Sequence, residues 1–228
     1  MKTLKIKIIL TTLVLITSTP LFADTIEDGR YWFALAMQGK LPVENWSWNF
    51  DVHQRYRDEG AQADQFFTRY SVAYQVAPKT SVALGFDHVV NHPAGNEAID
   101  ENRLWQQIHY KFDSIHGVNL SSRTRLEQRW RENGDETSYR FRQMIRATMP
   151  LNVNPKISLV AFDEVFINLN NTDWNVSRGN DQNRVFLGAS YTFNSNTSIE
   201  SGYLNQFVNT RNIDRMNHVL ATTLKLNF

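Results

Sequence analysis

The last nine residues of the chain, from Leu220 to Phe228, alternate apolar and polar side chains and end on an aromatic residue. Successive side chains of a β-strand point to opposite faces of the sheet, so this alternation gives the segment one apolar and one polar face. The apolar face carries Leu220, Leu224, Leu226 and Phe228, with Thr222 among them. The pattern predicts a terminal strand with an apolar environment on one side and a polar environment on the other.

A terminal strand of this kind, closed by an aromatic residue, resembles the assembly signal of bacterial outer-membrane β-barrels. The resemblance implies that Leu220, Leu224, Leu226 and Phe228 are recognised by the outer-membrane barrel assembly machinery. We therefore expect the chain to lie in the outer membrane of a Gram-negative bacterium, in contact with outer-membrane lipid.

The amino terminus predicts export from the cytoplasm. Three lysines precede a short apolar run that ends at Ile16, and small and polar residues then lead to Ala23. This order is typical of a secretory signal peptide cleaved after Ala23, and the run is too short for a transmembrane helix. We assign residues 1–23 to the signal peptide and 24–228 to a single outer-membrane β-barrel domain.

The composition of the exported part excludes several classes of protein. Cleavage removes three lysines and no acids, so the 24 Lys and Arg fall to 21, against 23 Asp and Glu, and a basic nucleic-acid footprint is absent. The chain has no cysteine, which excludes disulfides and thiolate metal sites. We expect a monomer that binds no nucleic acid and holds no metal or other cofactor.

Alternation with a period of two divides the exported chain into strands of the length that a tilted transmembrane strand needs, about 9–11 residues. The predicted strands cover residues 30–38, 45–57, 65–77, 80–90, 100–112, 118–131, 137–149, 156–168, 181–193, 197–208 and 217–228. Short, turn-rich connections alternate with mostly longer polar ones, as periplasmic turns and outward loops do in outer-membrane barrels. The predicted fold is an all-β transmembrane barrel with antiparallel, up-and-down strands.

The direction of the strands makes the segment at 30–38 difficult to place. If the strand ending at Phe228 reaches the periplasm and all neighbours are antiparallel, the segment at 45–57 is the first that starts on the periplasmic side. We therefore prefer ten spanning strands and treat Tyr31 to Gln38 as an inserted, partial or periplasmic strand. Twelve strands would require one that the pattern does not reveal, so the predicted count is about 10, within 10–12.

One face of each central strand is strongly charged. In the segment at 118–131, arginine and glutamate recur at alternate positions, and the segment at 137–149 repeats the division. An arginine that faces the middle of a bilayer costs about 2–4 kcal/mol, so this face must line the barrel interior or meet water. The predicted interior charges are Arg69, Glu101, Arg103, Arg123, Arg125, Glu127, Arg129, Arg140, Arg142, Arg146, Glu164, Arg184 and Glu200, and Asp87 takes an equivalent position on its strand.

The adjacent acids Asp163 and Glu164 cannot both face inward, because successive side chains of a strand alternate. We expect Glu164 to lie inside the barrel. For Asp163 we expect a β-bulge or a position close to a loop.

Two interpretations of the charged interior remain open. A barrel of about eight strands has just enough room for side chains and ten strands give little more, so arginine–carboxylate pairs can fill the lumen. Alternatively, the arginines line an electropositive vestibule or channel for anions. We favour a structural or narrow-pore protein without enzymatic activity, with a largely filled lumen rich in Arg and Glu.

The alternative is an outer-membrane enzyme that hydrolyses lipid or modifies lipid A. Such enzymes place a serine and a histidine, oriented by an asparagine or an acid, on the lipid-facing side near the outer rim. His88 is the one candidate, although a rim histidine also suits lipid head groups, and the chain has no G-x-S-x-G motif. We therefore assign no catalytic residue. A third possibility is a soluble periplasmic carrier, in which the apolar face would be buried in a core.

Several motifs spread over the exported chain together resemble one family. They are Glu101-Asn102-Arg103-Leu104-Trp105, Arg123-x-Arg125-x-Glu127-x-Arg129, Tyr139-Arg140-x-Arg142, Asp163-Glu164-x-Phe166 and Gln182-Asn183-Arg184-x-Phe186. In combination they are similar to a family of bacterial outer-membrane proteins catalogued as domain of unknown function 2490, over nearly the whole exported chain. The resemblance implies a membrane β-barrel and carries over no activity, substrate or catalytic residue.

Overall fold

The computed structural model describes residues 25–228, and these residues form eleven β-strands. The strands are Ile26–Lys40 (β1), Trp46–Arg57 (β2), Gln62–Ala77 (β3), Thr80–Asn91 (β4), Ile99–Lys111 (β5), Asn119–Arg131 (β6), Ser138–Leu151 (β7), Asn154–Asn168 (β8), Gly179–Thr192 (β9), Thr197–Val208 (β10) and Arg215–Asn227 (β11). The described chain contains no helix that is long and apolar enough to cross a membrane. The predicted signal peptide at 1–23 lies outside the described residues.

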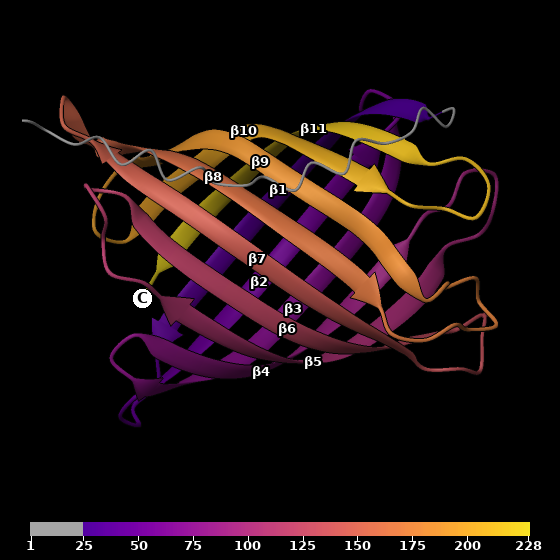
Figure 1. The fold of residues 1–228 in the computed structure, drawn as a ribbon, viewed down its shortest axis with the longest axis horizontal. Coiled ribbons are helices and arrows are strands. Elements are labelled where there is room, and N and C mark those ends of the chain that lie inside the picture. Colours follow the sequence, from indigo (N-terminus) through magenta and orange to yellow (C-terminus); the bar gives the residue numbers. More distant parts are fainter. Residues whose placement is uncertain (1–24) are drawn as a thin grey trace, which may run out of the picture.

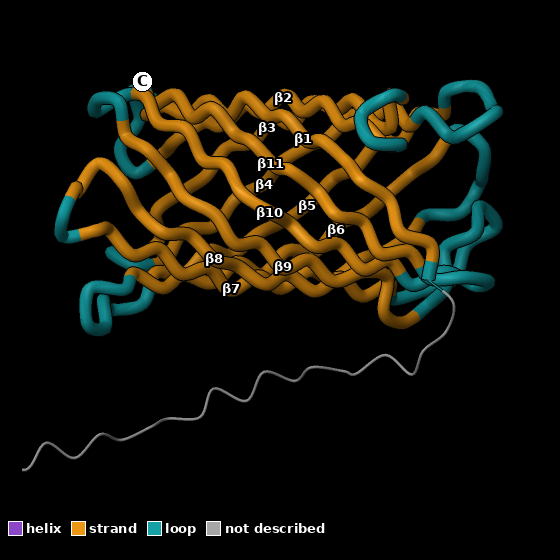
Figure 2. The backbone as a smooth tube through the Cα atoms, turned by 90° about the horizontal axis from the view of Figure 1, so that it is seen from above, coloured by secondary structure: helices purple, strands orange, loops and turns teal. Residues whose placement is uncertain are grey.

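All eleven strands belong to one closed barrel, in which each strand is hydrogen-bonded to two neighbours (Figures 1 and 2). Consecutive strands pair antiparallel, so the chain winds up and down around the cylinder. The ring is completed by β1 and β11, which pair parallel from Ile26 opposite Arg215 to Gln38 opposite Asn227. A closed ring has no edge strand and therefore no row of unpaired backbone groups.

The fold class is as predicted, an all-β closed barrel, but its first strand is placed differently. The predicted count of about 10, within 10–12, is close to the eleven strands observed, but Tyr31 to Gln38 belongs to a full strand of the ring and is not the inserted, partial or periplasmic strand that we preferred. Strand β1 pairs along its length with both β2 and β11. The prediction failed because it assumed antiparallel pairing throughout, whereas an odd number of up-and-down strands closes only when the first and last strands run in the same direction.

The connections give the barrel two different ends (Figure 1). At the end where β11 finishes, here called the turn end, the connections are residues 41–45, 78–79, 112–118, 152–153 and 193–196. At the other end, here called the loop end, they are residues 58–61, 92–98, 132–137, 169–178 and 209–214. Strand β1 begins at the loop end and finishes beside the carboxyl terminus, where the Phe228 N–H donates to the Gln38 carbonyl (2.9 Å).

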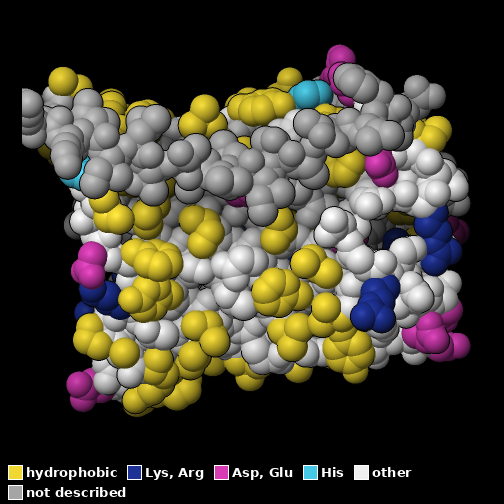
Figure 3. All heavy atoms as spheres, in the orientation of Figure 1, with side chains coloured by type: hydrophobic (Ala, Val, Ile, Leu, Met, Phe, Trp, Pro, Cys, Tyr) yellow, Lys and Arg dark blue, Asp and Glu magenta, His cyan; other side chains and the backbone are white. Residues whose placement is uncertain are grey.

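Large hydrophobic side chains cover the outside of the barrel. On β4, for example, Val82, Leu84 and Phe86 are exposed, whereas Asp87 and Val89 are fully buried. Figure 3 shows apolar side chains spread over the visible wall of the strands, with most charged side chains near the two ends. The alternation along each strand therefore separates an apolar exterior from a largely polar interior.

Aromatic side chains gather at the turn end of this apolar surface. The ring centroids lie 5.2 Å apart for Trp46 and Tyr74, 4.9 Å for Tyr110 and Phe112, and 5.0 Å for Tyr191 and Phe193. The ring of Phe228 stacks on Trp48 at 6.0 Å. Aromatic rings with a polar tip favour the boundary between apolar and polar surroundings, so this end has the character of an interfacial girdle.

Apolar and charged side chains fill different parts of the interior. Trp32, Val160, Phe186, Leu204 and Val219 form a buried apolar cluster on the inner side of β1 and β8–β11. The buried charged side chains come mainly from β4–β8. This apolar cluster was not predicted from the sequence, because an apolar residue in a strand can face either the lipid or a packed interior.

The two adjacent acids on β8 alternate as the strand geometry requires. Glu164 is buried, whereas Asp163 is exposed and accepts a hydrogen bond from Asn183 Nδ2 (2.6 Å). The expected bulge at Asp163 is not present, because the register with β7 is regular there and the irregularity toward β9 lies at Phe166. The neighbouring amide therefore accommodates this outward carboxylate.

A cysteine pair across the parallel seam tests how the ring is closed. Phe33 on β1 and Thr222 on β11 are paired, and the native chain has no cysteine. Neighbouring strands are about 4.8 Å apart, within the range that a disulfide can bridge, so Phe33→Cys with Thr222→Cys should cross-link on mild oxidation. The readout is the mobility of the oxidised protein on a gel.

The control pair replaces Phe33 and Leu187, both exposed, on strands that are not neighbours. We expect no cross-link from it. If the ring closed through β2 and β11, with β1 outside it, the first pair would fail as well.

Candidate functional site: the charged barrel interior

Glu127 on β6 is at the centre of the charged interior. Its side chain is fully buried, with 0% of the residue exposed. Glu127 Oε2 accepts hydrogen bonds from Arg140 Nε (2.9 Å) and Nη2 (2.7 Å), and Oε1 accepts one from Arg142 Nη1 (2.6 Å). Glu127 and Arg140 are directly paired across β6 and β7. Burial of an ionised carboxylate is unfavourable unless opposite charges and hydrogen bonds compensate it. Arg140 and Arg142 therefore allow Glu127 to be fully buried.

A second carboxylate extends this cluster to β8. Glu164 Oε1 accepts hydrogen bonds from Arg142 Nε (2.9 Å) and Nη2 (2.7 Å) and from Arg123 Nη2 (2.6 Å). Arg142 therefore bridges the two glutamates, and its guanidinium also lies over the ring of Phe166 at 4.3 Å. We call this set the central network: Arg123, Glu127, Arg140, Arg142 and Glu164.

The charge pairs continue toward the loop end. Glu101 on β5 accepts hydrogen bonds from Arg129 Nε (2.7 Å) and Nη2 (3.2 Å) and from Arg103 Nε (2.6 Å). Arg140 Nη1 reaches Asp181 on β9 (2.9 Å). As in the central network, one carboxylate holds two guanidinium groups, so hydrogen bonds between unlike charges fix the geometry.

On the β3–β5 side, Trp105 is packed among charged side chains. Trp105 Nε1 donates to Asp87 Oδ1 (2.7 Å), and Asp87 also accepts hydrogen bonds from Arg69 (3.0 and 3.2 Å). The guanidinium of Arg125 stacks on the indole at 3.7 Å. The ring fits because Gly85, paired with Trp105 on β4, has no side chain, and a Cβ there would come within 2.1 Å of the ring.

A smaller charge group links β7 to β10 and β11. Glu200 on β10 accepts a hydrogen bond from Lys225 Nζ on β11 (2.7 Å) and from Arg146 on β7. Arg146 and Glu200 were both among the predicted interior charges, and the structure pairs them with each other. Lys225 lies on the polar face of the terminal strand and helps to compensate the Glu200 carboxylate.

Arg55 and Arg184 are interior arginines without a carboxylate partner in the described part of the chain. Among the described residues, no carboxylate oxygen lies within 4.0 Å of Arg55 or Arg184. Arg55 donates to Gln65 Oε1 (2.8 Å) and Arg184 donates to Gln182 Oε1 (3.2 Å). Both guanidiniums lie over the ring of Trp32, at 3.9 and 5.0 Å. Arg184 is therefore apart from the ion pairs, and it adds uncompensated positive charge to the interior.

Sequence reasoning missed three charged side chains of the interior. Asp51 Oδ2 lies 3.5 Å from Arg69, Asp181 binds Arg140, and Arg55 stacks on aromatic rings. The alternation Asp51-x-His53-x-Arg55 on β2 was the signal that could have identified two of them. Asp181 stands close to the start of β9, where the alternation gives less guidance.

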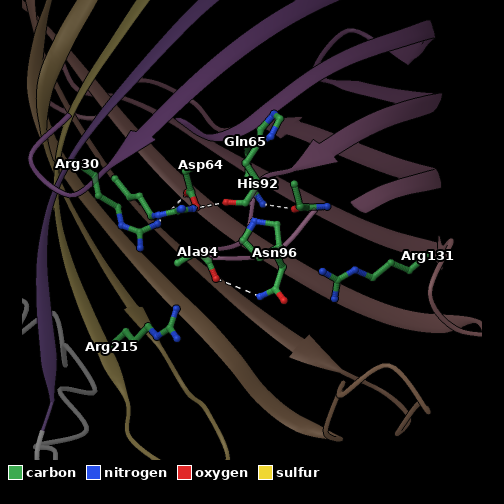
Figure 4. A pocket seen from close by; sticks show the side chains of 11 residues that line it. Arg30, Asp64, Gln65, His92, Ala94, Asn96, Arg131 and Arg215 are labelled. Carbon is green, nitrogen blue, oxygen red and sulfur yellow. Dashed lines mark hydrogen bonds and ion pairs between the residues drawn. The ribbon is translucent and has the colours of Figure 1, made fainter. Parts of the chain in front are cut away.

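The two ends of the barrel are hollow, and part of the charged interior lies between the two hollows. Each end has a hollow of about 430 Å³. Along β6, Arg123 and Arg125 line the turn-end hollow and Arg131 lines the loop-end hollow (Figure 4), while Glu127 and Arg129 lie between them. The central network therefore separates two polar vestibules.

The loops between β6 and β7 and between β8 and β9 are fastened to each other. Trp174 Nε1 donates to the Glu136 carbonyl (2.7 Å), and the Asp173 carboxylate accepts the backbone N–H groups of Asp135 (2.8 Å) and Glu136 (3.3 Å). These bonds, chiefly the one from Asp135, lower the pKa of Asp173. The buried ring of Trp174 lies 5.7 Å from the guanidinium of Arg131, so the fastened loops support one wall of the loop-end hollow.

His88 lies on the outside of the barrel, toward the loop end of β4. Its Nδ1 is 3.0 Å from Asn102 Oδ1, and its Nε2 is 3.8 Å from Asp100 Oδ2. Thr68 is the paired residue on β3, and the described contacts include no hydrogen bond between the Thr68 and His88 side chains. The histidine thus has an orienting amide but no bound hydroxyl. Within residues 25–228, no group of three or more His, Asp or Glu is placed to hold a metal ion.

Replacement of Glu127 by glutamine tests the central network. The substitution keeps the shape of the side chain but leaves Arg140 and Arg142 without their shared negative charge, so we expect a loss of about 3–5 kcal/mol in unfolding free energy. Urea unfolding of the refolded barrel in lipid vesicles measures it. The control Glu132→Gln removes the same charge from an exposed loop position and should change stability little. Equal effects of the two substitutions would contradict a structural role for Glu127.

Comparisons with known proteins find relatives over most of the chain. A family described as "Protein of unknown function (DUF2490)" matches residues 29–217. An uncharacterised protein of Methylorubrum extorquens is 32% identical over 224 residues, which is 96% of each chain.

Solved barrels are more distant. OmpT, an outer-membrane protein of Vibrio cholerae, is 14% identical with a TM-score of 0.40, over 72% of this chain and 55% of that one. An anion-selective porin from Comamonas acidovorans is 14% identical with a TM-score of 0.36, over 77% of this chain and 52% of that one. The chain thus spans about half the length of these solved structures. From the family match and the M. extorquens relative, the chain belongs to the family described as Protein of unknown function (DUF2490).

Proposed function

We propose that the protein is an outer-membrane β-barrel with a plugged interior, which serves as a structural or narrow-pore protein and prefers anions where it conducts. The observation that carries this proposal is the central network. It joins β6, β7 and β8 through largely buried ion pairs, and its Glu127 lies between the two hollows. Side chains that occupy the lumen in this way leave little room for large solutes.

The exterior supports the outer-membrane location. A continuous apolar wall of strands with aromatic side chains at its margin suits a hydrocarbon layer bounded by head groups, and a water-soluble monomer rarely exposes so much apolar surface. Closure of the ring satisfies the backbone hydrogen bonds that an open sheet would leave unpaired in lipid. The same exposure argues against the soluble carrier.

The preference for anions follows from the balance of interior charge. Glu127 and Glu164 are each bound by two arginines, whereas Arg55 and Arg184 have no carboxylate within 4.0 Å among the described residues. The lumen therefore carries more positive than negative charge. Such a lining attracts anions and repels cations of similar size.

The carboxyl-terminal strand suits the expected assembly route. Leu220, Leu224 and Phe228 are exposed on the outer face of β11, and Leu226 has the same orientation. This apolar stripe ends at the turn end, which the proposed orientation places at the periplasm. We propose that it is the segment presented to the barrel assembly machinery and afterwards to outer-membrane lipid, in a monomeric barrel.

Planar-bilayer recording tests the proposal. The purified protein should give either no conductance or small steps that favour anions, because the central network narrows the lumen. If steps are seen, Arg55→Gln with Arg184→Gln should reduce the anion preference, whereas Arg211→Gln in an exposed loop should not. Large cation-selective steps would contradict the proposal.

A lipid-modifying enzyme is the second candidate, and the contact between His88 and Asn102 favours it. An asparagine oxygen that accepts the Nδ1 proton would fix the ring with Nε2 free to act as a base. The nearest hydroxyl in register is that of Thr68, on the adjoining strand. This arrangement is on the apolar outer wall, where lipid esters would be accessible.

Lipid analysis of cells that carry the wild-type protein or His88→Ala distinguishes the candidates. A hydrolase should change the acyl chains of outer-membrane lipid, and His88→Ala should abolish the change, because the general base is lost. His218→Ala is the matched control, since His218 is also on the outer wall and contacts Tyr203 (2.6 Å) instead. Identical lipids with and without the protein would exclude the enzyme.

A further inference from the structure

We propose that the loop-end hollow is a binding site for a small soluble solute that carries an oxyanion, such as a phosphate or carboxylate group. The inference rests on the proposed outer-membrane location, because only in that orientation does the hollow face the outside medium. It adds a specific site to the general preference for anions.

The hollow lies in the mouth of the barrel itself. Its arginines come from β1 (Arg30), β2 (Arg57), β6 (Arg131) and β11 (Arg215), and β6 stands opposite β1 in the ring. In Figure 4, Arg131 and Arg215 reach into the hollow from different sides. A solute in the hollow would therefore meet guanidinium groups from opposite sides of the barrel.

Two of the arginines that line the hollow are paired with carboxylates, and the other two are not. Arg30 binds Asp28 (2.7 Å) and Asp64 (2.8 Å), and Arg57 lies 3.7 Å from Asp64. These two arginines and two acids balance. In contrast, no carboxylate of the described residues lies within 4.0 Å of Arg131 or Arg215. The hollow therefore retains two positive charges that nothing in its walls neutralises.

Arg131 lies beside a buried aromatic ring, and its charge is free. Its guanidinium lies 5.7 Å from the buried indole of Trp174, and its Nε is buried without a hydrogen-bond partner. The Trp174 ring is itself fixed by its bond to Glu136 and by close contact with Gly134. A guanidinium that is already ordered loses less entropy when it binds, and its fork matches two oxygens of a phosphate or carboxylate.

The rest of the lining selects a hydrated ligand over a lipid. Gln65, Asn91 and Asn96 contribute amides, and His92 is beside them (Figure 4), whereas Pro93 and Ala94 are the only apolar residues of the lining. Ligand pockets typically measure about 300–1,000 Å³, so a hollow of about 430 Å³ fits a small organic phosphate or dicarboxylate. An acyl chain would find almost no apolar contact there.

Calorimetric titration of the full-length protein with inorganic pyrophosphate, in an uncharged detergent at low salt, tests the site. Wild-type protein should bind, and Arg131→Gln with Arg215→Gln should weaken binding at least about tenfold, because charge-assisted hydrogen bonds are lost. Arg178→Gln is the control: it removes an exposed arginine from the same end of the barrel, outside the hollow, and should change binding less than about twofold.

A second variant guards against a folding defect in the double mutant. Asn96→Asp adds a negative charge to an exposed position of the lining and removes no arginine, so it should weaken binding as well. Micelles that contain phosphatidic acid should not compete with pyrophosphate, whereas competition would assign the site to a lipid phosphate. Absence of wild-type binding, or equal weakening by Arg178→Gln, would overturn the inference.

The outcome is separable from that of the proposed function. Failure to bind pyrophosphate, in a barrel that still fractionates with the outer membrane and conducts anions, overturns the site alone. Recovery of the protein outside the outer membrane overturns the proposed function, whatever the titration gives.

Discussion

The parallel pairing of β1 with β11 is the contact on which the rest of the barrel depends. It turns ten antiparallel hairpin contacts into a ring with an inside and an outside. Once the ring is closed, alternation along every strand decides which side chains meet solvent or lipid and which meet one another. Without this seam, β1 and β11 would be edge strands with unpaired backbone groups. The interior charges would then have no enclosed space in which to pair. The ion pairs therefore depend on the closure of the ring.

The interior carboxylates compensate the repulsion between buried arginines. Arginine at alternate positions of neighbouring strands places several like charges within a narrow lumen, and their burial is unfavourable unless carboxylates lie between them. Glu127, Glu164 and Glu101 each hold two guanidiniums, so a few acids compensate many arginines. Because these ion pairs connect neighbouring strands, they also couple the strands energetically. A change at Glu127 affects β6 and β7 directly and reaches β8 through Arg142.

Much of this interior was predictable from the sequence, because a strand has only two faces. The run Arg123-x-Arg125-x-Glu127-x-Arg129 indicates one charged face, and membrane energetics direct it inward. The sequence did not reveal how the ring closes, because alternation carries no information about parallel or antiparallel neighbours. Nor could it show that Arg184 reaches Trp32 across the lumen, or that Gly85 makes room for Trp105. Such contacts depend on strand tilt and register, which place distant residues together.

Charged side chains are not required to fill this lumen. On the inner side of β1 and β8–β11 the same barrel is packed with apolar residues, including Val160, Phe186 and Leu204. Apolar packing is often as stable as a buried ion pair or more so, so the chain had a simpler way to close the remaining space. The arginines are also more numerous than pairing needs, since Arg55, Arg131, Arg184 and Arg215 have no carboxylate within 4.0 Å among the described residues. Stability gives no reason to retain unpaired guanidiniums at a cost in desolvation and mutual repulsion. Recognition of anions does, which is why the unpaired charges carry more information about function than the paired ones.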